Sequence, residues 1–127
     1  MISVSDEVFE QLISDVMDEL PQQYIKDLKN VAIVYEDEPT QPQRADLQLR
    51  CDQTLFGLYQ GIPRTQRGAG YNMVLPDKIT LFKNPMLARS NTMAELRKQV
   101  KHTLWHEVAH HYGLEHERIH ELERKLK

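Results

Sequence analysis

The segment HEVAHHYGLEH, residues 106–116, places the strongest constraint on the fold of this chain. Residues four positions apart lie on the same face of a helix, one turn above the other. His106 and His110 can therefore each direct one imidazole nitrogen toward a common point, provided that the segment is helical. The spacing predicts a helix that carries both histidines on one face.

Flanking residues predict where this helix begins and ends. Thr92 and Glu95 have the spacing of a capping box, in which each side chain satisfies a backbone N–H at the helix start. Gly113 is a stop signal, because glycine adopts the left-handed conformation without steric cost. We expect a helix that starts after Thr92 and runs to Tyr112.

The histidine spacing also predicts the chemistry of the segment. Two imidazoles on one face are half of a zinc site, and Glu107 projects to the adjacent flank, where it can deprotonate a water molecule at the metal. A left-handed turn at Gly113 lets His116 return to the ion as a third ligand. Three neutral nitrogens and one open position are typical of catalytic zinc, so we expect Zn²⁺ bound by His106, His110 and His116.

The remaining histidines have ordinary structural explanations. All six histidines of the chain lie between residues 102 and 120. On a helical projection His111 shares its face with apolar residues, which predicts a core histidine bonded to a buried group. We expect His102 at an exposed helix position and His120 at the surface. The apolar residues on the face of His111 are Met93, Leu96, Val100, Leu104 and Val108.

Hydrophobic patterns elsewhere predict a further helix and several strands. Apolar residues recur at helical spacing between Ser5, a capping residue, and Pro21, which predicts a helix of about fifteen residues. Runs of β-branched and aromatic residues bounded by turn residues predict strands. The expected strands are residues 31–36, 55–61 and 78–83.

The connections between these elements differ in length. Residues 37–53 are polar and contain Pro39 and Pro42, so we expect a long surface loop or a partly disordered excursion. A turn that contains Met86 and Leu87 is expected between the last strand and the long helix.

Length and charge limit the possible functions. A chain of 127 residues forms one hydrophobic core, so we expect a single domain, 1–127. The net charge of -3, from 16 Lys and Arg against 19 Asp and Glu, argues against nucleic acid as a partner. No apolar run is long enough to span a bilayer, and the N-terminus lacks the pattern of a secretory signal. We therefore expect no membrane partner and a cytoplasmic location.

Five segments of the chain resemble the small bacterial zincin-like metallopeptidases, or minimal zincins. The segments are FEQLISDVMDELP, VAIVYEDEP, LFGLYQGIP, LPDKITLFKNP and HTLWHEVAHHYGLEHERIHEL. The resemblance implies an α+β, minimal zincin-like fold, in which a small β-sheet packs on an N-terminal helix and on a long metal-binding helix. It also implies zinc, peptidase chemistry, His106 and His110 as ligands, Glu107 as general base and residue 116 as third ligand.

The chain departs from that family at the third ligand. Family members often carry aspartate where this chain has His116, so Glu115 and Glu117 are alternatives. All five methionines precede the motif, so the methionine turn of the larger metzincins is missing, and only eleven residues follow His116. We expect a shallow, open site that holds a flexible peptide or unfolded polypeptide along an edge strand, or that another chain completes.

The predicted activity is zinc-dependent hydrolysis of peptide bonds. In this reaction Glu107 takes a proton from water and passes it to the leaving amine. Tyr59, Tyr71 and Tyr112 are candidate hydrogen-bond donors to the oxyanion. Two other functions are open. One is a metal-dependent endoribonuclease of the rRNA-maturation type, whose similar motif has glycine in place of Glu107, and the other is a non-catalytic, metal-stabilised interaction module.

Overall fold

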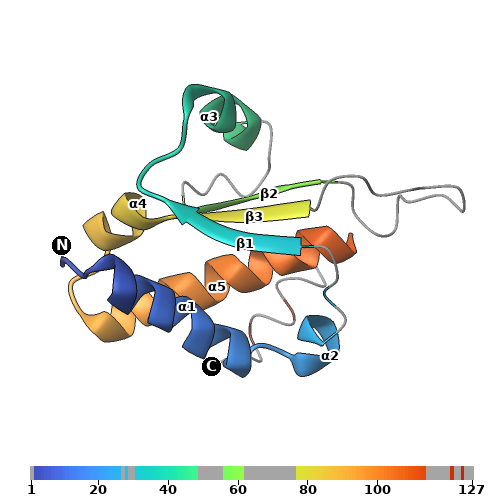
Figure 1. Cartoon of the computed structure of the whole chain (residues 1–127), viewed down its shortest axis with the longest axis horizontal. Coiled ribbons are helices and arrows are strands. Elements are labelled where there is room, and N and C mark those ends of the chain that lie inside the picture. The colour runs from blue at the N-terminus through green and yellow to red at the C-terminus, as the bar shows by residue number, and fades with distance from the viewer. Residues whose placement is uncertain are drawn as a thin grey trace, which may run out of the picture.

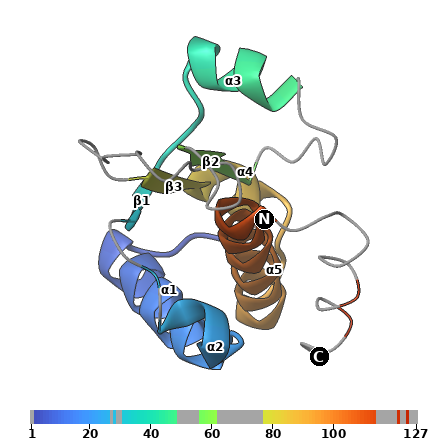
Figure 2. The ribbon, with the colours of Figure 1, turned by 90° about the vertical axis from the view of Figure 1, so that its right-hand side faces the viewer.

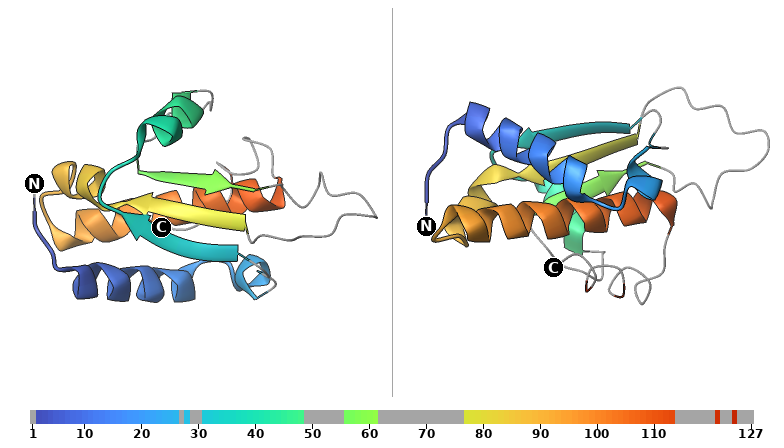
Figure 3. Two further views of the ribbon diagram at one scale, coloured as in Figure 1. Left: turned by 45° about the horizontal axis from the view of Figure 1, so that its top comes forward. Right: turned by 90° about the horizontal axis from the view of Figure 1, so that it is seen from below.

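Three strands form one mixed sheet, β1 (Val31–Glu36), β2 (Gly57–Gln60) and β3 (Asp77–Phe82). The sheet order is β1-β3-β2, with β1 parallel and β2 antiparallel to the central strand β3 (Figure 3). The three expected strands are thus confirmed, with small shifts at their ends. The computed structural model describes residues 2–26, 28, 31–48, 56–61, 77–113, 121 and 124.

Two helices, α1 (Asp6–Glu19) and α5 (Met93–Tyr112), lie on one face of this sheet (Figure 1; Figure 2). The helix α3 (Gln41–Gln48) lies on the opposite side and stands away from the strands. Two short helices, α2 (Gln22–Ile25) and α4 (Lys83–Ala88), follow α1 and β3 along the chain. The predicted α+β architecture is confirmed, because the small sheet packs on the N-terminal helix and on the long helix that carries the histidines.

The first helix begins and ends where the sequence predicts. The Ser5 side chain accepts a hydrogen bond from the backbone N–H of Val8 at 3.2 Å, and the helix ends before Pro21. This cap satisfies one of the backbone donors that a helix start leaves without an intrahelical partner. The buried residues of α1, which recur at helical spacing, are Phe9, Leu12 and Val16.

Both predicted ends of α5 are confirmed. Thr92 Oγ1 accepts a hydrogen bond from the backbone N–H of Glu95 at 3.1 Å, and Glu95 Oε1 accepts one from the backbone N–H of Asn91 at 2.8 Å. At the other end, Gly113 has the left-handed angles φ 70° and ψ 29°. Its backbone N–H donates to the carbonyl of His110 at 2.9 Å, which closes the last turn.

The main core lies between the sheet and the two long helices. Residues 103–109 of α5 are all buried, so this part of the helix is enclosed by its neighbours. Although α5 has 20 residues, no helix in the described part of the chain is long and apolar enough to cross a membrane. The large, fully buried side chains include Phe9, Tyr59, Ile79, Leu81, Leu96, Leu104 and Trp105.

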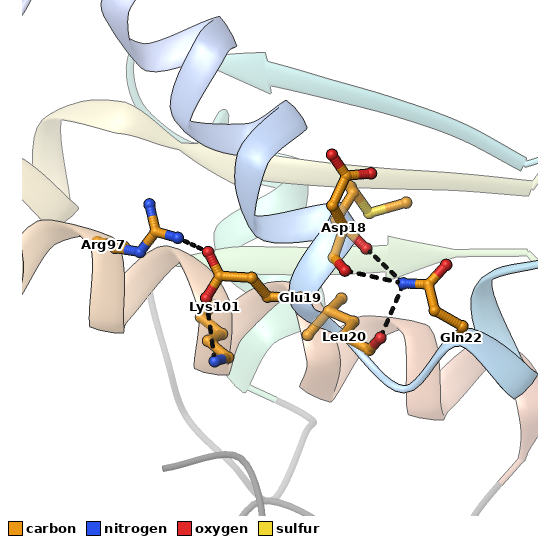
Figure 4. A network of polar contacts seen from close by, with 7 residues as sticks. Asp18, Glu19, Leu20, Gln22, Arg97 and Lys101 are labelled. Carbon is orange, nitrogen blue, oxygen red and sulfur yellow. Dashed lines mark hydrogen bonds and ion pairs between the residues drawn. The ribbon is translucent and has the colours of Figure 1, made fainter.

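Polar contacts join the C-terminal end of α1 to α5 (Figure 4). The Glu19 carboxylate forms ion pairs with Arg97 and with Lys101, the latter at 3.3 Å. The amide nitrogen of Gln22 donates to three carbonyl oxygens, which satisfies acceptors that a helix end leaves without an intrahelical partner. These carbonyls belong to Met17, Asp18 and Leu20. Of these contacts, the ion pairs of Glu19 link α1 to the long helix.

The structure corrects the expectation for residues 37–53, because this polar segment contains the helix α3. The backbone N–H of Thr40 donates to Gln43 Oε1 at 2.8 Å, and that of Gln43 donates to Thr40 Oγ1 at 3.3 Å. Pro42 lies in the first turn, where a helix needs no N–H donor. The Thr-x-x-Gln spacing is that of a capping box and could have indicated the start of this helix. The sequence of α3 has little apolar periodicity to support that indication. Likewise, the short helix α4 replaces the turn expected around Met86.

Candidate metal centre

Three side chains converge near the C-terminal end of α5. Potential ligand atoms of His106, Glu107 and His110 all lie within 4.8 Å of one another. The centroids of the two imidazole rings are 4.6 Å apart, with an interplanar angle of 60°. Glu107 Oε1 lies 3.6 Å from His110 Nδ1. The structure therefore brings together three of the four residues of the predicted site.

The three side chains differ in exposure. His106 is 7% exposed and Glu107 is 1% exposed, whereas the His110 side chain is 13% exposed. His106 and Glu107 project from the buried part of α5, and His110 directly follows it. The side of His110 is therefore the more open to solvent.

The donor set suits a zinc ion. Imidazole nitrogen and carboxylate oxygen are both groups that Zn²⁺ accepts, and two histidines one helical turn apart form the core of a zinc site. Ligands about 2 Å from one ion lie within about 4 Å of one another. A cluster whose ligand atoms lie within 4.8 Å is therefore near the required size.

The rest of the predicted site lies outside the described residues. This holds for His116, for the alternative ligands Glu115 and Glu117, and for Tyr71. The described helix reaches Gly113, whose left-handed conformation is the turn that the predicted ligation requires. The left-handed conformation of Gly113 is thus confirmed, and the third ligand stays a prediction.

His111 is a buried core histidine, as its helical face predicts. It is 1% exposed, and its Nδ1 lies 2.9 Å from Asp77 Oδ2. The Tyr59 hydroxyl donates to the same carboxylate oxygen at 2.6 Å. Sequence reasoning did not single out Asp77, although a charged residue at the start of an apolar strand can indicate a buried polar network.

The structure gives two of the candidate oxyanion donors partners within the fold. Tyr59 bonds to Asp77, and the Tyr112 hydroxyl donates to the backbone carbonyl of Tyr24. The rings of Tyr112 and Tyr24 are also in edge contact, with centroids 5.2 Å apart. His102, expected at an exposed position, is half-buried.

Strand β2 packs directly on α5. Gly57 lies so close to the helix that a Cβ atom there would be 2.5 Å from Thr103 Cγ2. Thr103 lies one turn before Glu107 on the helix. Strand β2, at one border of the sheet, therefore runs along α5 (Figure 1).

A capped helix that carries an HExxH segment beneath a small mixed sheet is the arrangement of a zincin-type domain. The family model described as zincin-like metallopeptidase matches residues 28–126, and the chain belongs to this family. This match confirms the resemblance found in the sequence. No curated protein shows a significant match to the chain.

Proposed function

We propose that the chain is a zinc-dependent metallopeptidase. The observation that supports this function most strongly is the convergence of His106, Glu107 and His110 near the C-terminal end of α5. Zn²⁺ bound there supplies Lewis-acid chemistry, which polarises a scissile carbonyl and makes a water molecule more acidic. Membership of the zincin-like metallopeptidase family supports the same reaction class.

The ligands in this proposal are His106, His110 and His116. The first two are supported by their close approach on one helix face, and the third by the left-handed turn at Gly113. Glu115 and Glu117 are the alternatives to His116, because family members often carry a carboxylate near this position.

Glu107 is the proposed general base. Its carboxylate is almost fully buried and lies 3.6 Å from the ring of His110, so it is held beside the proposed ligands. In the proposed reaction it accepts a proton from the attacking water and transfers it to the leaving amine.

The proposed substrate is an extended peptide or an unfolded polypeptide. Within the described residues, β2 pairs with β3 alone, so its other side is not hydrogen-bonded to a described strand. An extended chain can add to such an edge through backbone hydrogen bonds. Because β2 packs on α5, a peptide added there lies next to the proposed metal centre.

A Glu107→Gln variant tests this proposal. The substitution keeps size and removes the proton acceptor, so zinc remains bound while hydrolysis of fluorescently labelled casein falls by about 100-fold or more. Glu7→Gln, at an exposed position in the first turn of α1, is the matched control and keeps full activity. Equal hydrolysis by the wild type and Glu107→Gln contradicts the mechanism.

The same preparations separate the two rival functions. Cleavage of RNA but not of casein by the wild type indicates an endoribonuclease. Zinc binding without turnover of either substrate indicates an interaction module. The single domain 1–127 and the cytoplasmic location stay predictions of the sequence.

A further inference from the structure

Strand β2 rests on α5 at two places, one on each side of the metal-binding residues along the helix. The first place is Thr103, three residues before His106, and the second is His111, directly after His110. Eight residues of helix rise about 12 Å. On β2 the contacting residues are Gly57 and Tyr59, which lie two positions apart, about 7 Å along the strand, so the Tyr59 side chain and the Asp77 carboxylate cover the remaining distance.

The first contact depends on the absence of a side chain. A Cβ atom at Gly57 would lie 2.5 Å from Thr103 Cγ2, a separation that real Cβ atoms essentially never show. It would also lie 3.4 Å from Leu81 Cδ2 on the neighbouring strand β3. Only glycine lets the backbone of β2 lie this close to the helix.

The second contact is a buried polar network. Tyr59 of β2 donates to Asp77 Oδ2 at 2.6 Å, and the same oxygen lies 2.9 Å from Nδ1 of His111 on α5. All three side chains are buried, and a buried polar group that loses its hydrogen-bond partner costs free energy. The network therefore stabilises the positions of Tyr59, Asp77 and His111. The strand is therefore linked to the helix through the first residue of β3.

The end of β2 packs on the same carboxylate. Gly61 has a positive φ of 155°, and a Cβ atom there would lie 2.4 Å from both Cγ and Oδ1 of Asp77. The Asp77 side chain is thus enclosed by the backbone after β2, by the Tyr59 hydroxyl and by the His111 ring. No side chain larger than hydrogen fits at Gly57 or Gly61 unless a neighbouring atom shifts.

We propose that Gly57, Tyr59, Asp77 and His111 are positioning residues. They fix the distance between β2 and α5 and the position of β2 along this helix at the proposed metal centre. An extended polypeptide added to β2 then presents one peptide bond at that centre. This inference rests on the proposed peptidase function and names the residues that align its substrate. None of the four contacts the reacting atoms in this proposal.

The first experiment introduces a steric clash between β2 and α5 and then removes the clash with a second substitution. Gly57→Ala pushes β2 away from α5, and kcat/KM for labelled casein falls by about tenfold or more, chiefly through kcat, because a small misplacement of the scissile bond is costly. Thr103→Ser removes Cγ2, so the double variant Gly57→Ala with Thr103→Ser recovers most of the loss. Thr103→Ser alone is the control and behaves like the wild type. An unchanged kcat in Gly57→Ala, or no recovery in the double variant, overturns the proposal.

The second experiment needs no peptidase activity. Tyr59→Phe breaks the buried network, and amide hydrogen exchange of residues 57–60 in the zinc-supplied protein becomes about tenfold faster. Zinc affinity stays within about threefold of the wild type. The control is Lys83→Met, which breaks the 2.7 Å ion pair between the buried Lys83, the first residue of α4, and Asp6, the first residue of α1.

The control separates local positioning from general destabilisation. Lys83→Met lowers stability but leaves exchange of residues 57–60 unchanged relative to the other strands. Equal acceleration at 57–60 in Tyr59→Phe and Lys83→Met overturns the proposal. If the wild type does not cleave casein, the proposed function fails, and the exchange data still decide whether the network positions β2.

Discussion

His110 and His111 are adjacent in the chain but face different surroundings. The His110 ring approaches His106 and Glu107 at the more open side of α5, whereas the His111 ring is buried against Asp77. Neighbouring residues on an α-helix project about 100° apart, because the helix has 3.6 residues per turn. The pair therefore assigns one imidazole to the proposed metal centre and the other to the core beneath the sheet.

Alanine substitutions at these two positions have different effects. His110→Ala abolishes tight zinc binding, because a proposed ligand is lost. His111→Ala keeps zinc but lowers the free energy of unfolding by about 1–3 kcal/mol, since the buried Asp77 carboxylate loses a partner. Competition with a chromophoric chelator measures the affinity, and urea unfolding measures the stability. Complete loss of zinc in both variants contradicts the division into two faces.

Purified chain supplied with zinc binds about one ion per molecule, which elemental analysis measures. Imidazole binds the metal in its neutral form, so zinc affinity decreases as the pH falls through about 6.5, the ordinary pKa of histidine. Zinc also raises the thermal midpoint, because it binds the folded chain. An affinity that is constant between pH 5 and pH 8 speaks against histidine ligands.

The third ligand is identified by three single variants. His116→Ala weakens zinc binding strongly, whereas Glu115→Ala and Glu117→Ala leave the zinc affinity nearly unchanged. Isothermal titration with zinc gives the three affinities under one condition. The opposite ranking transfers the third position to a carboxylate.

The turn after α5 is tested at Gly113. The left-handed φ of 70° strains a β-branched residue by about 1–3 kcal/mol, so Gly113→Val weakens zinc binding and lowers stability. Gly113→Asn is the matched control, because asparagine tolerates this conformation, and its zinc affinity stays close to that of the wild type. Wild-type affinity in Gly113→Val shows that zinc binding does not depend on this turn.

The ends of the helices were predictable because local chemistry determines them. Ser5, Thr92 and Gly113 act on backbone groups within three or four residues, so the sequence around them contains the whole signal. The same reasoning explains the proximity of His106 and His110. Helix α3 was missed even though Thr40 and Gln43 form a capping pair, because its polar composition suggested a loop.

The residues around the predicted ligands were not predictable in the same way. Asp77 meets Tyr59 and His111 across 18 and 34 positions of the chain, and Gly57 meets Thr103 through the packing of a strand on a helix. Such contacts depend on the strand order β1-β3-β2, which periodicity and capping do not determine. The sequence identified a buried role for His111, and only the tertiary structure identified its partner.

The sheet order also has a consequence for folding. Lys78 of β3 pairs with Gln60 of β2, 18 residues earlier, whereas Asp77 pairs with Val31 of β1, 46 residues earlier. Loop-closure entropy rises with the logarithm of loop length, so the shorter closure costs less by roughly 0.8 kcal/mol for a flexible chain. The strand pair that packs on α5 therefore has the lower contact order of the two. In conformational entropy, the half of the sheet that we propose to face the substrate is the easier half to assemble.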